Sequence, residues 1–173
     1  GAGAPRPPPR GHGQAVNRGM TQGMTWSWHR LGDMAAGLLL EILQLRQDVF
    51  ILEQQCLYPD IDGLDPIARH LVGRDGSGVI VAYCRVFGPG DYYSEVAVGR
   101  VLVARSARGT GAARALMEEA HRYCGEALGG SAVRLNAQAH LQGFYEGLGY
   151  SHVRGPVDED GIPHVEMLRA ALT

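Results

Sequence analysis

The sequence predicts one α/β (α+β) domain with a mixed central β-sheet of about six or seven strands and helices on both of its faces. Three observations predict this fold class. Segments with the alternating or β-branched pattern of strands outnumber helical segments. Several of these strands follow one another through hairpin turns, with helical segments before and after them. The composition, 45% hydrophobic and 20% charged over 173 residues, is typical of a globular domain with a full core.

Residues 1–23 form a separate region of the chain. They begin GAGAPRPPPRGHGQ and are dominated by Gly, Pro and Arg, with few apolar side chains to bury. Such a segment cannot offset the entropy of ordering, so we expect a disordered extension, either native or added to the protein. It lacks the apolar stretch of a secretory signal. The folded domain is expected over residues 24–173.

The first predicted elements are a strand and a helix. Residues 25–31 alternate aromatic and polar side chains, which indicates a strand. Asp33 is placed to cap a helix over residues 34–53. Pro, Asp and Gly then predict a loop over residues 56–66. One stripe of the helix is apolar and should face the core; it comprises Leu38, Ile42, Leu45, Val49 and Leu52.

Three strands follow in succession. Residues 68–73 and 79–87 are apolar segments joined by Arg74-Asp75-Gly76-Ser77-Gly78, which is a hairpin sequence. A second turn at Gly88-Pro89-Gly90-Asp91 leads to a long β-branched strand over residues 95–103.

The second half of the chain alternates helices and strands. Gly129-Gly130 and Gly149 are expected to end two helices, because glycine readily adopts the left-handed conformation at a helix C-terminus. In chain order the predicted elements are helix 111–128, strand 132–137, helix 140–148, and strands 151–153 and 164–168 on either side of a turn at 158–161.

Charge and composition exclude several classes of function. The net charge is -2 and no basic block follows the first segment, so neither nucleic acid nor an anionic membrane is an expected partner. The apolar stretch at residues 37–40 is too short to span a bilayer. The three cysteines lack C-x-x-C spacing. We therefore expect free thiols in a cytoplasmic protein, with neither disulfides nor a cysteine zinc site.

The most informative segment, residues 99–114, is a strand that enters a glycine-containing turn and then a helix. A helix N-terminus presents free N–H groups and the positive end of a dipole, and glycine lets an anion approach the backbone. Arg108 and Arg114 add positive charge, so this turn is a candidate pyrophosphate site. The chain has no lysine-bearing Walker A sequence, and Arg114 stands where a dinucleotide fingerprint needs glycine.

These residues resemble motif A of the GNAT acetyltransferases, R/Q-x-x-G-x-G/A, which fits Arg108-Gly109-Thr110-Gly111-Ala112-Ala113. Over residues 26–168, further segments are similar to the ElaA-like branch of this family. These segments are Leu45-Arg46-Gln47-Asp48-Val49-Phe50, Glu53-Gln54, Tyr58-Pro59-Asp60-Ile61-Asp62-Gly63, Arg69-His70-Leu71, Ala82-Tyr83-Cys84-Arg85, residues 137–145 and Asp160-Gly161-Ile162-Pro163-His164.

The resemblance implies a GNAT fold, whose sheet splays between two central parallel strands so that acetyl-CoA binds in the V-shaped opening. Arg105 departs from the proline common in the family. Gln138 departs from the common asparagine but matches the ElaA-like branch. The implied contacts to the acetyl-pantetheine arm are Val101, Leu102 and Val103. The implied contacts to the rest of acetyl-CoA are the backbone amides of Arg108, Gly109, Thr110, Gly111, Ala112 and Ala113, with Arg114, Gln138 and Tyr145.

Acetyl transfer to an amine requires a neutral amine, a hydrogen-bond donor to the oxyanion and a proton for the departing thiolate. By resemblance, Tyr145 lies near the CoA sulfur and is the candidate acid; its alternative role is aromatic packing. A backbone N–H near Val103 is the candidate oxyanion donor. Glu53, at the end of the first helix, is either the catalytic base or an exposed carboxylate.

Candidate acceptor-binding residues are charged or titratable. Acidic side chains could bind a cationic acceptor or form turns, and histidines could carry protons or serve structure. No H-E-x-x-H spacing occurs, so no metal is expected. The candidates are Arg46, Asp60, Asp62, His70, His140 and His164. The arginines that must be paired if buried are Arg46, Arg85 and Arg100, and their candidate partners are Asp48, Asp60 and Asp62.

The sequence therefore predicts an N-acetyltransferase that moves the acetyl group of acetyl-CoA to a primary amine, which could be a small amine, a peptide N-terminus or a lysine. The alternative is a non-catalytic, regulatory module that binds acyl-CoA on the same fold. Tyr145 and the intact anion turn favour the enzyme. A monomer and a homodimer are both compatible with the sequence.

Overall fold

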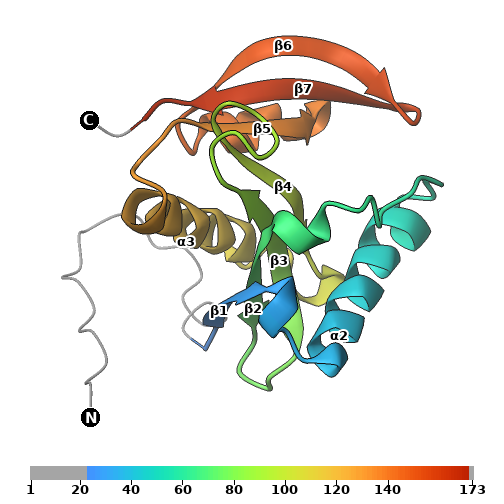
Figure 1. Ribbon diagram of the computed structural model, residues 1–173. Coiled ribbons are helices and arrows are strands. Elements are labelled where there is room, and N and C mark those ends of the chain that lie inside the picture. The colour runs from blue at the N-terminus through green and yellow to red at the C-terminus, as the bar shows by residue number, and fades with distance from the viewer. Residues whose placement is uncertain (1–22, 172–173) are drawn as a thin grey trace.

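A computed structural model describes residues 23–171 of the chain, so the predicted disordered extension, residues 1–23, lies outside the described residues except for Gly23. The predicted fold class is confirmed. Within the described residues, seven strands form one mixed sheet in the order β1-β2-β3-β4-β5-β7-β6. Helix α2 covers one face of the sheet and helix α3 covers the other (Figure 1).

The first four strands of the sheet pair in an antiparallel manner: β1 (Thr25–Arg30), β2 (Arg69–Arg74), β3 (Ile80–Phe87) and β4 (Val96–Val103). Every residue of β3 is buried, because the strand has helices on both of its faces. Ala82 and Cys84 pack in the cluster that contains α3, whereas Tyr83, between them, packs in the cluster that contains α2. The predicted hairpin between β2 and β3 is present and is closed by Asp75, whose carboxylate accepts hydrogen bonds from the backbone of Ser77 and Val79.

The first helix differs from its prediction at both ends. Helix α2 (Ala36–Arg46) has Ala35 at its N-cap position, which offers no capping side chain. Asp33 does not cap this helix, because it belongs to a preceding 3-10 turn, η1 (Leu31–Asp33). From Gln47 the chain continues as a π-helical segment, η2 (Gln47–Glu53). The wider π turn shifts the apolar stripe, so that Leu52 is 61% exposed and Phe50 is buried in its place.

The centre of the sheet opens between β4 and β5 (Val133–Gln138). These strands are parallel, but their pairing is confined to residues 96–98 of β4 and 133–135 of β5. The register of β4 against β3 also shifts between Tyr83 and Arg85, and Arg100 takes a φ of 50° at this irregularity. The last residues of β4 and β5 are therefore free to line a space between them.

The second half of the chain covers the α3 face and extends the sheet. Helices α3 (Ala112–Ala127) and α4 (Gln142–Glu146) pack on the same core cluster, and the 3-10 turn η5 (Ala139–Leu141) leads into α4. The last two strands, β6 (Tyr150–Glu159) and β7 (Ile162–Arg169), form a hairpin much longer than predicted. The full length of β6 escaped prediction because nearly all of its side chains are exposed and show no apolar alternation.

The three cysteines, Cys56, Cys84 and Cys124, are free and buried in this structure. Among residues 23–171, no helix combines the length and apolar character needed to cross a membrane.

Candidate active site

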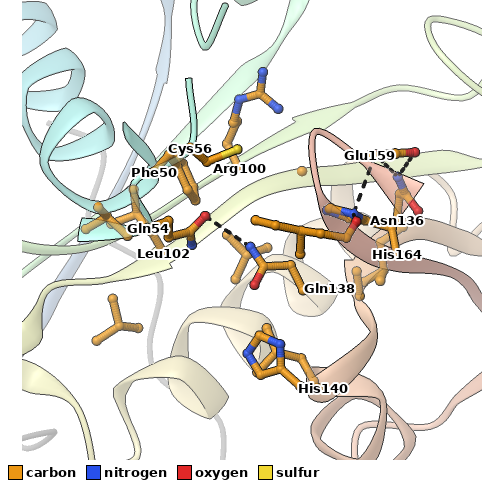
Figure 2. Close-up of a pocket in the computed structure, with 18 of the residues that line it drawn as sticks. Phe50, Gln54, Cys56, Arg100, Leu102, Asn136, Gln138, His140, Glu159 and His164 are labelled. Carbon is orange, nitrogen blue, oxygen red and sulfur yellow. Dashed lines mark hydrogen bonds and ion pairs between the residues drawn. The ribbon is translucent and has the colours of Figure 1, made fainter. Parts of the chain in front are cut away.

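A cavity of about 780 Å³ lies where β4 and β5 diverge. One wall comes from η2 and the loop after it, including Phe50, Cys56 and Tyr58. The ends of β4 and β5, helix α4 and the turn between β6 and β7 complete the lining. Figure 2 shows Phe50, Gln54 and Cys56 on one side of this cavity and Asn136, Glu159 and His164 on the other. The cavity therefore gathers residues that lie far apart in the sequence.

A second cavity, of about 180 Å³, lies at the predicted anion turn. Gly109 and Gly111 both adopt positive φ angles, of 74° and 87°, and a Cβ on Gly109 would meet no atom of the described part of the chain within 4 Å. No side chain of residues 23–171 caps α3, and the first N–H groups of a helix have no partner within it. Thr110 donates its hydroxyl to the Ala107 carbonyl at 2.5 Å and so fixes the turn. The turn can thus receive an anion on its backbone donors.

The two predicted arginines of this turn already have partners. Arg108 forms an ion pair with Glu53 and donates its Nε to the Val103 carbonyl at 3.2 Å. Arg114 lies 3.7 Å from Glu118, on the exposed side of the helix. The hydrogen bond from Arg108 lowers the pKa of Glu53, which makes this carboxylate a weaker base than a free glutamate.

The predicted pantetheine edge, residues 101–103 of β4, lines the large cavity. The Ala104 N–H donates to the Val81 carbonyl of β3 at 2.7 Å. Successive N–H groups of a strand point in opposite directions, so the Val103 N–H points toward β5, where pairing has already ended. The candidate oxyanion donor therefore faces the cavity side of β4.

Tyr145, the candidate acid, comes from α4, lines the large cavity and is 4% exposed. Burial, with a smaller effect of nearby Cys84, raises the pKa of Tyr145 well above its usual value. Its ring packs edge-on against Phe144 and Tyr150, with centroids 5.0 and 5.7 Å away. The residue thus packs in the core and also borders the cavity, and its hydroxyl stays protonated at neutral pH.

Gln138, at the end of β5, crosses the large cavity toward the π-helical segment. Its Nε2 donates to Oε1 of Gln54 at 3.1 Å, and the two amides point toward each other (Figure 2). Together with the Glu53–Arg108 ion pair, this hydrogen bond links η2 to the other walls of the cavity.

Two of the six acceptor candidates, His140 and His164, line the large cavity. Asn136, Glu159 and Cys56 also line it but were missed from the sequence. Asn136 could have been found from the predicted site residue Gln138, because residues two apart on a strand share a face.

The other four candidates, Arg46, Asp60, Asp62 and His70, do not line the cavity, so their positions do not support the predicted contact with the acceptor. Arg46 is 1% exposed and is paired with Asp60 and Asp65. His70 is also 1% exposed, with its ring nitrogens 2.7 Å from the Tyr83 hydroxyl and 2.9 Å from the Asp65 carbonyl.

The predicted pairing of the three arginines is confirmed, although one predicted partner was wrong. Asp48 is exposed and forms no ion pair within residues 23–171, whereas Asp65, which was not predicted, binds both Arg46 and Arg85. Burial alone would raise the pKa of Asp62, but hydrogen bonds from Arg85 and from the Leu64 N–H hold it at about 2. The three arginines and their three carboxylate partners form one buried ion network, which comprises Arg46, Arg85, Arg100, Asp60, Asp62 and Asp65. Arg100 also lines the large cavity.

No group of three or more His, Cys, Asp or Glu side chains within the described part of the chain could hold a metal ion.

Comparisons with known proteins identify the family of the chain. Residues 49–170 match the acetyltransferase (GNAT) domain family. Protein ElaA of Escherichia coli is 37% identical over 149 residues, which cover 85% of this chain and 97% of ElaA. The UPF0039 protein sll0451 of Synechocystis is 39% identical over 145 residues, covering 84% of this chain and 94% of that protein.

Solved structures give the same result. An acyl-CoA N-acyltransferase from Pseudomonas aeruginosa superposes with a TM-score of 0.80 at 36% identity, over 85% of this chain and 99% of that chain. The crystal structure of E. coli ElaA superposes with a TM-score of 0.78 at 36% identity, over 84% of this chain and 99% of ElaA. The chain therefore belongs to the GNAT acetyltransferase family and is a close relative of ElaA.

Proposed function

We propose that this protein transfers the acetyl group of acetyl-CoA to a primary amine by direct attack of the amine on the thioester. The observation that carries this proposal is the junction of the two cavities. The uncapped start of α3 borders the smaller cavity, and both cavities are lined by Val103, Arg108, Ala113 and Phe144. A pyrophosphate at the turn would therefore place its attached arm along β4.

The residues present fit acetyl-CoA. Backbone donors and the open space at Gly109 suit the pyrophosphate. The apolar side chains of Val101 and Val103 suit the pantetheine arm, and the edge of β4 that β5 leaves free can hydrogen-bond its amides. The acetyl group would then lie near Tyr145, inside the larger cavity.

The reaction needs few groups from the protein. The amine nitrogen attacks the thioester carbon, and the Val103 N–H stabilises the negative charge on the carbonyl oxygen. The C–S bond then breaks, and the departing sulfur takes a proton from the Tyr145 hydroxyl. The attacking nitrogen gives up a proton in turn, which restores the Tyr145 hydroxyl. The products are an N-acetyl amine and free CoA. The acceptor classes that we propose are a small amine, a peptide N-terminus or a lysine.

Calorimetry with acetyl-CoA and a thiol-release assay test this proposal. The acceptors are ethylamine, spermidine, a peptide with a free N-terminus and a lysine peptide. We expect binding of acetyl-CoA and thiol release with at least one amine. Folded protein with no affinity for acetyl-CoA or CoA would overturn the proposal. Binding without thiol release for any amine would favour the non-catalytic acyl-CoA-binding module.

A further inference from the structure

A histidine on the far wall of the large cavity is held in one orientation. His164 lies on β7, where it pairs with Gln138 of β5, and its side chain is 17% exposed. It lines the same cavity as Tyr145 and Val103. Its position places it on the side of the cavity away from η2 (Figure 2).

The hydrogen bonds of this ring define its tautomer. Nδ1 of His164 lies 2.8 Å from the Ile162 carbonyl oxygen, which can only accept a hydrogen bond. Nδ1 must therefore carry the hydrogen, and in the neutral ring the lone pair is on Nε2. A neutral histidine with a free Nε2 lone pair is the form that accepts a proton.

A carboxylate stands beside the same nitrogen. Oε2 of Glu159 is 3.8 Å from His164 Nδ1, and the Asn136 amide lies 2.9 Å from each oxygen of Glu159. Figure 2 shows the contacts of Glu159 with both residues. Asn136 thus orients Glu159 on the Nδ1 side of the His164 ring.

The other candidate bases are less well placed. Glu53 is engaged by Arg108, which lowers its pKa. His70 lies outside the cavity, both of its ring nitrogens have partners, and burial lowers its pKa. His140 lines the cavity, but among residues 23–171 no hydrogen bond fixes its ring.

We infer that His164 is the general base that removes a proton from the acceptor ammonium, with Glu159 and Asn136 as its positioning residues. This inference rests on the proposed function. In the step, Nε2 of His164 takes one proton from R–NH3⁺ and becomes imidazolium, and the neutral R–NH2 attacks the thioester carbon. The second amine proton follows the route through Tyr145 to sulfur. His164 then returns its proton to solvent, so one proton is released per turnover.

Several other charged or titratable side chains surround His164. Glu159 and Asp160 come from the hairpin between β6 and β7. Glu166 lies on β7, on the same face of the strand as His164. Charged and titratable groups from the other surrounding elements are Arg100 of β4, Arg134 of β5, His140 of η5, and Cys56 and Glu53 from the opposite wall.

The test compares His164→Gln with a matched control, His152→Gln. His152 lies on β6 outside the cavity, and its ring also contacts a backbone carbonyl, at 3.0 Å from Gly155. The acceptors are ethylamine, which is protonated at neutral pH, and trifluoroethylamine, which has a similar shape but is largely neutral. We expect His164→Gln to lower kcat/KM for ethylamine about 100-fold or more. Transfer to trifluoroethylamine should change little, and so should either reaction in His152→Gln.

Two further readouts separate catalysis from structure. Acetyl-CoA affinity, by calorimetry, should be unchanged in His164→Gln. In His164→Gln, kcat/KM for ethylamine should rise with pH as the fraction of free amine rises, so that its deficit relative to wild type shrinks, and Glu159→Gln should lower kcat/KM for ethylamine more than for trifluoroethylamine.

Each failure has its own signature. If wild-type protein and His164→Gln acetylate both amines equally well, the assignment of His164 as the base is wrong, but the proposed function stands. Equal losses for the two amines would also overturn it, because a base is needed only for the protonated acceptor. Wild-type protein that neither binds acetyl-CoA nor acetylates either amine would overturn the proposed function and this inference together.

Discussion

Glu53 and Arg108 are 55 residues apart in the chain and form an ion pair that joins the end of the π-helical segment to the anion turn. Both residues line the large cavity, and Arg108 also lines the smaller one. The Arg108 side chain, whose charge the sequence places at the candidate pyrophosphate site, is therefore held by a carboxylate in this structure. Acyl-CoA must compete with Glu53 for Arg108 or bind beside their ion pair.

Replacing Glu53 by glutamine should strengthen the binding of acetyl-CoA. The variant frees Arg108 from its partner, and a partly exposed ion pair contributes up to about 1 kcal/mol, so we expect an affinity gain of up to about five-fold by calorimetry. Glu41→Gln, which removes a surface partner of Arg74, is the control and should not change affinity. A loss of kcat of about 100-fold in Glu53→Gln would contradict this view and support Glu53 as the base.

An added methyl group at Gly109 should weaken acetyl-CoA binding. Alanine at a φ of 74° costs about 1 kcal/mol of folding stability, and its Cβ would occupy the open space of the anion turn. Gly78→Ala is the matched control, because Gly78 has a φ of 87°, similar open space and a position in the hairpin between β2 and β3. Both variants should lose similar stability in urea unfolding. Only Gly109→Ala should lose affinity, by about ten-fold or more, and equal affinities would rule out this turn as the pyrophosphate site.

The hydroxyl of Tyr145 should matter for turnover more than for folding. Phenylalanine keeps the ring that packs against Phe144 and Tyr150, so the thermal midpoint should change little. We expect kcat to fall about ten-fold to 1,000-fold while acetyl-CoA affinity is retained. Tyr92→Phe, at a residue 55% exposed and away from the cavity, serves as control. Unchanged kcat in Tyr145→Phe would leave the residue with a packing role alone.

The buried ion network should give the fold a defined acid sensitivity. The pKa of Asp62 is about 2 in the folded state, below its value of about 3.9 in an unfolded chain. A lowered folded-state pKa contributes stability above the unfolded value, and this contribution is lost as the pH falls toward about 2. Wild-type protein should therefore lose about 1 kcal/mol more unfolding free energy between pH 5 and pH 3 than Asp62→Asn does.

Urea titrations at the two pH values measure this difference. Asp48→Asn is the control, because Asp48 is exposed and forms no ion pair among residues 23–171. It should follow the wild-type pH dependence. Identical pH dependence in Asp62→Asn and wild type would show that the carboxylate has no stabilising partner in solution.

The sequence was a good guide where periodicity reports burial. The α3 helix and strands β1 to β5 lie close to their predicted ranges, because their apolar faces pack on a core that the pattern reflects. The π-helical segment escaped this reasoning, since a stripe drawn at the spacing of an α-helix misplaces Leu52 and omits Phe50. The length of β6 escaped it as well, because an exposed edge strand has no buried face to mark it.

The candidate site was predictable only in part. The anion turn is contiguous in sequence, so its glycines and arginines could be found together. The wall that carries Asn136, Glu159 and His164 is assembled from two strands and a turn that meet only in the folded sheet. Asp65 was missed for the same reason, since its two arginine partners are contributed by a helix and a strand distant in sequence.

The early end of pairing between β4 and β5 leaves main-chain donors and acceptors at the middle of a sheet, where a protein would ordinarily satisfy them with another strand. Under the proposed function, the pantetheine arm would occupy that place and hydrogen-bond to the free edges of both strands. Amide hydrogens at the ends of β4 and β5 should then exchange more slowly when acetyl-CoA is present, and the resistance of the whole domain to unfolding should rise with the concentration of its substrate.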